Sequence, residues 1–357
     1  MTTSPSGARV PLDGLGVRLL DVGHGNSAVV WDGTVCSVVD VAPGDLVNEE
    51  LRRLGCTRIE HLVISHSDKD HAGGAARLLL DDARTIGTIW YTADGHKRSE
   101  TWQRMLRAVE FRLRTGGLDD QQNIHSGMKR RLHNGRAWLE CVHPDVVMAG
   151  TGPTGRHPTA GTLTANTVSV VVKVHLDDVP AALLTADIDA IALAELERRD
   201  ADLTAPVLVF PHHGGRPGRA NPGEFAYRMT QLVAPKLIVF SIQGGGRASN
   251  PHPDVVAAVR RAAPDAHIAC TQVSRHCHTR LEPLPAGHLS IGPAAGRERG
   301  RCCAGSLAIT SGADGLVIDP PLPAHASFVD QHVAAPLCRP AIVTAVPAAR
   351  DGEALGG

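Results

Sequence analysis

The sequence has few aromatic residues and almost no net charge. Phe, Trp and Tyr make up 3% of its 357 residues, which argues against a long groove that stacks the bases of a single-stranded nucleic acid. The formal net charge of −1 excludes a whole-protein attraction to nucleic acid or to anionic membranes. Binding partners must therefore be inferred from local sites.

Long apolar runs are also missing. Residues 1–12 are polar and contain Pro and Gly, without the apolar core of a signal peptide, and no later run approaches the length of a membrane span. We expect a cytoplasmic protein with no membrane partner, whose 8 cysteines are reduced thiols or metal ligands rather than disulfides. With 43% hydrophobic residues, the chain can bury a sizeable core.

Short runs rich in Val and Leu alternate with helical patterns. We predict strands at residues 17–21, 27–31, 35–41, 61–64, 167–174, 181–184, 207–210 and 236–241. We predict helices at 45–54 and 75–84, and a third that is capped by Ser99 and extends to Leu113. This alternation predicts an α/β protein in which helices cover the sheets.

One loop concentrates residues that bind metals. The segment Ser65-His66-Ser67-Asp68-Lys69-Asp70-His71 directly follows a buried strand and precedes a helix. A loop there can curl two imidazoles and two carboxylates onto one point, and zinc or manganese favours such mixed ligands. Four potential ligands suit a two-metal site better than a single closed one. The alternative is a solvated polar loop in which Asp70 caps the helix.

The motif His66-x-Asp68-x-Asp70-His71, followed by Gly73-Gly74, resembles the metal motif of the metallo-β-lactamase superfamily. With Asp at position 68, the motif resembles that of the branch that contains the hydrolase domain of ComEC-type DNA-uptake proteins and the choline-phosphate esterases. Further segments match that branch in order, from about residue 16 to about residue 275: 21–26, 39–40, 166–169, 184–187, 211–214 and 250–253. His24, Asn26, Ala186 and Gly215 depart from its usual residues, but none of the four is an implied metal ligand.

The resemblance implies a metallo-β-lactamase fold, which is a four-layer αβ/βα sandwich. It also implies two divalent metal ions, zinc or manganese, bridged by Asp187. The implied ligands are His66, Asp68, Asp70, His71, Asp187 and His213. Asp40, Asp21 and Asn166 are expected to support these ligands from behind, Asp40 by orienting an imidazole.

Two cations roughly 3.5–4 Å apart lower the pKa of a shared water and hold both oxygens of a displacement. The expected nucleophile is the resulting hydroxide. The expected catalytic residues are Asp70, His212 and His252, with His212 as the first candidate and His252 as the second for donating a proton to the leaving oxygen. We expect a phosphodiesterase or nuclease. A hydrolase of small esters or lactones and a non-catalytic module that binds a partner are the alternatives.

Basic residues gather between residues 97 and 136, after the metal loop. They are Lys97, Arg98, Arg104, Arg107, Arg112, Arg114, Lys129, Arg130, Arg131 and Arg136. A basic segment beside the metals would attract nucleic acid or a nucleotide as substrate. The alternative is a solvated helix face. No feature of the sequence identifies a protein partner.

Cysteines gather in the last quarter of the chain. A structural zinc held by Cys270, Cys277, Cys302 or Cys303, and Cys338 would staple this region, although paired Cys-x-x-Cys spacing is absent and buried thiols are the alternative. We predict one hydrolase domain at residues 1–320 with an insertion at 272–304, and a tail at 321–357. The run from Ser306 to Thr310 is predicted to form a hairpin with the strand that contains Cys270.

Overall fold

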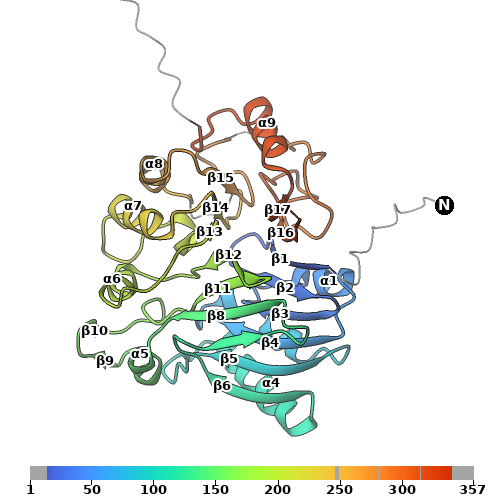
Figure 1. Cartoon of the computed structure of the whole chain (residues 1–357), viewed down its shortest axis with the longest axis vertical. Coiled ribbons are helices and arrows are strands. Elements are labelled where there is room, and N and C mark those ends of the chain that lie inside the picture. The colour runs from blue at the N-terminus through green and yellow to red at the C-terminus, as the bar shows by residue number, and fades with distance from the viewer. Residues whose placement is uncertain (1–13, 246–248, 280–281, 314, 340–357) are drawn as a thin grey trace, which may run out of the picture.

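The computed structural model describes residues 14–245, 249–279, 282–313 and 315–339. Two large sheets pack face to face, and helices cover the outer face of each (Figure 1). The last part of the predicted tail, residues 340–357, lies outside the described residues. Among the described residues, no helix combines the length and the apolar character needed to cross a membrane.

The first sheet contains eight strands in the order β17-β16-β1-β2-β3-β4-β5-β6. Their bounds are β1 (Leu15–Leu19), β2 (Ala28–Asp32), β3 (Val35–Val39), β4 (Arg58–Ile64), β5 (Thr85–Tyr91), β6 (Leu118–Asn123), β16 (Leu307–Gly312) and β17 (Gly315–Asp319). Its outer face is covered by α1 (Leu46–Arg53), α3 (Ala75–Leu79) and α4 (Glu100–Thr115).

The second sheet contains seven strands in the order β15-β14-β13-β12-β11-β8-β7. Their bounds are β7 (Lys129–Arg131), β8 (Ala137–His143), β11 (Val171–Leu176), β12 (Val179–Leu184), β13 (Val207–Val209), β14 (Leu237–Phe240) and β15 (His267–Cys270). Its outer face packs against α6 (Ala190–Arg198), α7 (Pro222–Val233) and α8 (Pro253–Ala262).

Four further helices and a short ribbon complete the described chain. The metal loop ends in α2 (Lys69–Ala72), and α5 (Val146–Thr151) lies beside the ribbon of β9 (Arg156–His157) and β10 (Gly161–Thr162). A turn of 3-10 helix, η1 (Pro211–Gly214), follows β13. The helix α9 (Leu322–His332) lies near the C-terminus.

Side-chain alternation along the strands generates the layers. Consecutive residues of a strand point to opposite faces, so Val30 of β2 packs between the sheets while Val29 packs under the helices. In β12, Leu184 faces the central core and Leu183 faces the outer helices. The predicted α/β fold, a four-layer αβ/βα sandwich, is confirmed.

Two of the predicted helices are present with different success in their bounds. The helix capped by Ser99 is present as α4, and Ser99 Oγ accepts a hydrogen bond from the amide of Trp102. The helix predicted at residues 75–84 ends at Leu79. Asp81 accepts a hydrogen bond from the amide of Ala83 and pairs with Arg84, and such local bonds compete with a helix.

The predicted hairpin between the strand of Cys270 and residues 306–310 is wrong. Strand β16 pairs with β1 and β17 in the first sheet, whereas β15 is the edge of the second sheet. The two ends of the predicted insertion do meet, because Gln272 and Cys302 form an isolated antiparallel bridge. Local sequence located these two strands but could not determine their pairing with distant segments.

Candidate metal centre

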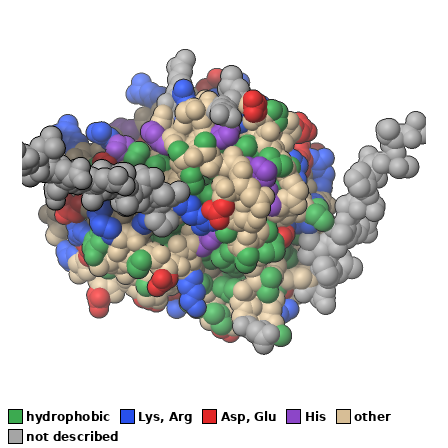
Figure 2. All heavy atoms as spheres, turned by 90° about the horizontal axis from the view of Figure 1, so that it is seen from above, with side chains coloured by type: hydrophobic (Ala, Val, Ile, Leu, Met, Phe, Trp, Pro, Cys, Tyr) green, Lys and Arg blue, Asp and Glu red, His purple; other side chains and the backbone are tan. Residues whose placement is uncertain are grey.

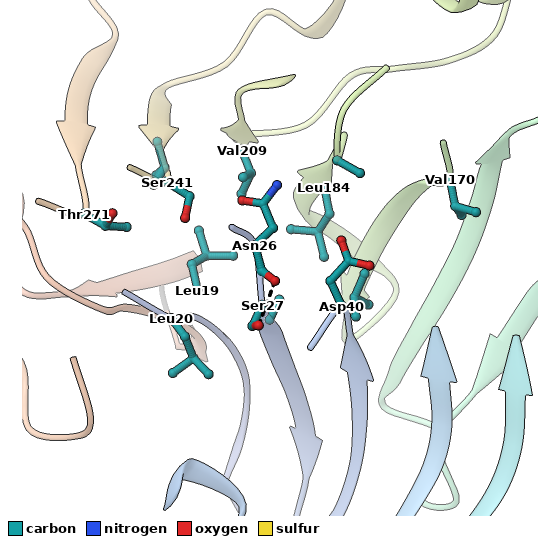
Figure 3. Close-up of a pocket in the computed structure, with 14 residues that line it drawn as sticks. Leu19, Leu20, Asn26, Ser27, Asp40, Val170, Leu184, Val209, Ser241 and Thr271 are labelled. Atoms are coloured by element: carbon teal, nitrogen blue, oxygen red, sulfur yellow. Dashed lines mark hydrogen bonds between the residues drawn. The ribbon is translucent and has the colours of Figure 1, made fainter. Parts of the chain in front are cut away.

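The predicted ligands converge where several strands end. The metal loop follows β4, Asp40 follows β3, Asp187 follows β12, and η1 follows β13. In Figure 3, Asp40 and Asn26 line one internal cavity together with Leu184 and Val209, which come from the facing sheet. The centre therefore lies at the edge of the seam between the sheets.

Four side chains lie close together in the middle of the candidate centre. Asp70, His71, Asp187 and His213 offer ligand atoms that all lie within 4.8 Å of one another, and they form the one such set in the part of the chain that is described. Nε2 of His71 lies 3.3 Å from Asp187 Oδ1. Nε2 of His213 lies 3.4 Å from Asp70 Oδ2 and 3.6 Å from Asp187 Oδ1.

Polar atoms in this region are buried without a hydrogen-bond partner. They are His66 Nε2, His71 Nε2, Asp187 Oδ1, His212 Nε2 and His213 Nε2. Leaving such atoms unsatisfied costs about 1–3 kcal/mol each, and buried polar groups in proteins are nearly always satisfied. Nitrogen and carboxylate oxygen are the donors that zinc and manganese accept, so these residues fit divalent metal ions.

The other ring nitrogen of each buried imidazole is held in place. His71 Nδ1 lies 2.6 Å from Asp40 Oδ2, and Asp40 also accepts hydrogen bonds from the amide and hydroxyl of Ser65. The carbonyl of Ser241 lies 2.8 Å from His213 Nδ1. These contacts fix both rings so that Nε2 faces the centre, which is how buried metal-binding imidazoles are commonly oriented.

The backbone takes unusual conformations around the centre. Asp40, Ala186, His212 and His213 all have positive φ angles, between 44° and 60°. Such strain clusters at functional sites, where the surrounding structure maintains it. Gly25 has φ 123°, and a Cβ there would lie 2.2 Å from the carbonyl oxygen of Asp70. Only glycine lets the opening turn lie this close to the metal loop.

His66 and Asp68 lie beside the four central residues. The hydroxyls of Ser65 and Ser169 lie 3.0 and 3.2 Å from His66 Nδ1, and His66 Nε2 lies 3.7 Å from Asp68 Oδ2. The rings of His66 and His71 are 4.2 Å apart between centroids. All six implied ligands are thus brought into one region, with His66 and Asp68 on one side of it.

Electrostatics keeps the carboxylates ionised. Burial alone would raise the pKa of Asp70, but His213 and His71 lower it to about 2. The neighbouring His66 ring, and after it the ammonium of Lys97, hold the pKa of Asp68 well below its usual range. His71 and His213 likewise outweigh burial and lower the pKa of Asp187. Because metal ligands must be deprotonated, these carboxylates are ready to bind at neutral pH.

Two residues at the centre were missed as site residues from the sequence. His24 Nε2 lies 3.3 Å from Asp70 Oδ2, and the ring of His24 lies 4.8 Å from that of His213. The ammonium of Lys97 contacts Asp68 Oδ1. The departure of His24 from the usual residue of the ComEC-type branch was visible in the sequence, but nothing in the sequence linked Lys97 to Asp68.

Three predicted residues have other partners than those expected. Asp21 binds the side chain of Gln272 and the amide of Gly296, so it anchors the insertion. His252 caps α8 by accepting a hydrogen bond from the amide of Asp254, which gives no support to a role as proton donor. The backbone carbonyl of Asn166 accepts a hydrogen bond from the amide of Ser169, and within the described part of the chain its side chain makes no hydrogen bond to an implied ligand.

The basic segment is largely paired with acids. Arg112 binds Asp82, Arg131 binds Asp178 and Arg136 binds Asp177, while Lys129 and Arg104 pair with Glu140 and Glu100. The segment also divides between α4 and β7, which belong to opposite layers. These pairings reduce the positive charge that the segment could offer to a long polyanion. Figure 2 shows the opposite end of the molecule from α4, and on that face charges of both signs are mixed.

Residues 20–127 match the family model of the metallo-beta-lactamase superfamily, and no curated protein matches the chain. Among solved structures, the chain is similar to Igni18, a metallo hydrolase from the archaeon Ignicoccus hospitalis, with 16% identity, a TM-score of 0.42, and coverage of 71% of this chain and 94% of the other. It is also similar to a diphosphatase of the PhnP family, with 14% identity, a TM-score of 0.37, and coverage of 64% and 87%. Scores this low carry no argument about activity.

The matched segment contains the opening turn, Asp40 and the metal loop. This segment is therefore similar to the metallo-β-lactamase superfamily, and the αβ/βα sandwich agrees with the fold of that superfamily. A candidate cluster for divalent metals lies where the segments of this fold converge. The narrower likeness to the ComEC-type branch stays a prediction.

Proposed function

We propose that this protein is a metal-dependent hydrolase that cleaves phosphodiesters. The observation that carries the proposal is the group of buried, unpartnered nitrogen and oxygen atoms around Asp187. Asp70, His71 and His213 would hold one divalent ion, His66 and Asp68 a second, and Asp187 both. When bound, such ions act as Lewis acids and lower the pKa of water toward neutrality.

The chain's own residues prepare this site for proton transfer. His212 Nδ1 lies 3.4 Å from Asp187 Oδ2, so the carboxylate orients the His212 ring. Its Nε2 has no protein partner and can hold the proton that a leaving oxygen needs. Asp40 and Ser65 meanwhile keep the ring of His71 fixed, so the site needs little rearrangement during the reaction.

The charges at the rim favour an anionic substrate. Lys97 and His24 both contact carboxylates of the centre from partly exposed positions. Divalent ions would withdraw negative charge from those carboxylates, which leaves Lys97 able to pair with a phosphate. Because the basic segment is mostly paired with acids, we favour a nucleotide-sized diester over a long nucleic acid.

The direct test is hydrolysis of bis(p-nitrophenyl) phosphate with added manganese or zinc, next to a lactone substrate. We expect metal-dependent cleavage of the diester, and its loss in the Asp70→Ala, His71→Ala double variant. Cleavage of the lactone alone would replace the phosphodiesterase by a small-molecule esterase. Metal-loaded protein that cleaves neither substrate would favour a module that only binds metal.

Replacing Lys97 should separate anionic from neutral substrates. In Lys97→Met, we expect KM for the diester to rise about tenfold, which corresponds to about 1.4 kcal/mol, because a cation beside the substrate is lost. Hydrolysis of a neutral ester should change much less. The matched control is Lys69→Met, since Lys69 is an exposed lysine of the metal loop. Equal losses on both substrates would show that Lys97 acts through the metal ligands instead.

A further inference from the structure

Four cysteines line one cavity beside β15, the edge strand of the second sheet. Cys270 ends β15, Cys277 follows in the next loop, Cys303 closes the insertion, and Cys338 follows α9. Apart from Ser274, the remaining lining residues are apolar: Pro251, Val256, Ile268, Val273, Val329, Val333, Pro336 and Leu337. Strand β15, the predicted insertion and the segment after α9 thus bring half of the chain's 8 cysteines to one place.

Two of these sulfur atoms have a hydrogen-bond partner. His325, which is fully buried, places Nε2 3.2 Å from Cys303 Sγ and Nδ1 2.8 Å from His267 Nε2. If His267 donates to Nδ1, neutral His325 carries its proton at Nε2 and donates it to the sulfur. The amide of Leu337 donates to Cys277 Sγ at 3.5 Å. Such donors stabilise thiolates rather than thiols.

Cys302 is excluded from this group although it is adjacent to Cys303. Its Sγ lies 3.3 Å from Asp21 Oδ2, on the side of the opening turn. The sequence left open which of the two cysteines would take part, and the structure assigns Cys303 to the cavity. All eight cysteines are free, so no disulfide competes for these sulfurs.

We propose that Cys270, Cys277, Cys303 and Cys338 bind one structural zinc ion. Tetrahedral sites with four sulfur ligands are typical of zinc. The four sulfurs surround the cavity more loosely than the ligand atoms of the first centre, so they must move inward on binding. Because the ligands come from β15, the insertion and the segment after α9, the ion would join all three.

The test measures zinc and iron per chain in purified protein by elemental analysis. Cys303→Ser should lose one zinc per chain relative to wild type, and its melting temperature should fall. Cys302→Ser is the matched control, because its side chain faces Asp21, and it should keep the wild-type zinc content. Cys338→Ser, at the edge of the cavity, repeats the test in case Cys303→Ser does not fold.

A second readout separates this ion from those of the first centre. Cobalt bound to thiolates absorbs strongly in the near ultraviolet, whereas cobalt bound to imidazole and carboxylate does not. We expect this absorption in cobalt-substituted wild type and in the Asp70→Ala, His71→Ala variant, but not in Cys303→Ser or Cys338→Ser. Unchanged zinc content in both cysteine variants would overturn the proposal, as would iron in place of zinc, or fewer than eight titratable thiols in denatured, metal-free protein.

Discussion

Asp187→Asn should reduce kcat/KM for the diester by about 10³-fold, which corresponds to about 4 kcal/mol of transition-state stabilisation. The carboxylate lies between three imidazoles, with Oδ1 near His71 and His213 and Oδ2 near His212. An amide has nearly the same shape but no charge, and one of its two atoms is a donor that cannot bind a cation. The variant should also bind less metal per chain.

Asp189→Asn is the matched control for this prediction. Asp189 is two residues away and equally buried, but it caps α6, and asparagine is an equally good N-cap. Its activity and metal content should stay near those of wild type. The ligand role of Asp187 is refuted if Asp187→Asn retains the activity and metal content of that control.

Asp40→Asn should weaken metal binding 10- to 100-fold, the usual cost of removing a group that orients a ligand imidazole. It should also lower the free energy of unfolding of the metal-free protein by about 3 kcal/mol, because it breaks a buried charged pair. Asp40 is almost fully buried and bonds to both Ser65 and His71. Calorimetric titration with metal and urea unfolding in a chelator measure the two effects.

The control for Asp40 must share its backbone conformation. Asp200 has φ 51° against 60° for Asp40, and it is exposed, so Asp200→Asn tests the substitution without the buried contacts. It should change neither metal affinity nor stability measurably. A metal affinity of Asp40→Asn equal to that of wild type would mean that Ser65 alone orients the ring of His71.

The layered fold could be predicted because it depends on local patterns. Alternating Val and Leu define strands such as β2, and the cap at Ser99 defines the start of α4. The metal loop was recognisable because its ligands are almost contiguous in sequence. Asp187 and His213 were found only through the order of family-like segments, since a single Asp or His at a strand end has many possible uses.

What could not be predicted depends on contacts between distant segments. The partner of β16 is β1, almost 300 residues earlier, and no turn signal encodes such a pairing. The basic segment seemed free in the sequence because Asp177 and Asp178 follow about 40 residues after the arginines they pair with. Lys97 contacts Asp68 because the chain folds back between the two residues, and local periodicity does not predict such a contact.

The pairing of β1 with β16 also affects how the protein is made. During synthesis the chain emerges from its N-terminus, so β1 has no neighbour on its outer side until residues 307–312 have left the ribosome. The turn that carries His24 is also fixed late in synthesis, since Asp21 is anchored by Gln272 and Gly296. An unpaired strand edge invites pairing with other chains, and contacts of such long sequence separation form slowly. The nascent protein therefore exposes an unpaired strand edge until β16 has been made, and the turn beside the candidate metal centre is anchored only after residue 296 has been made.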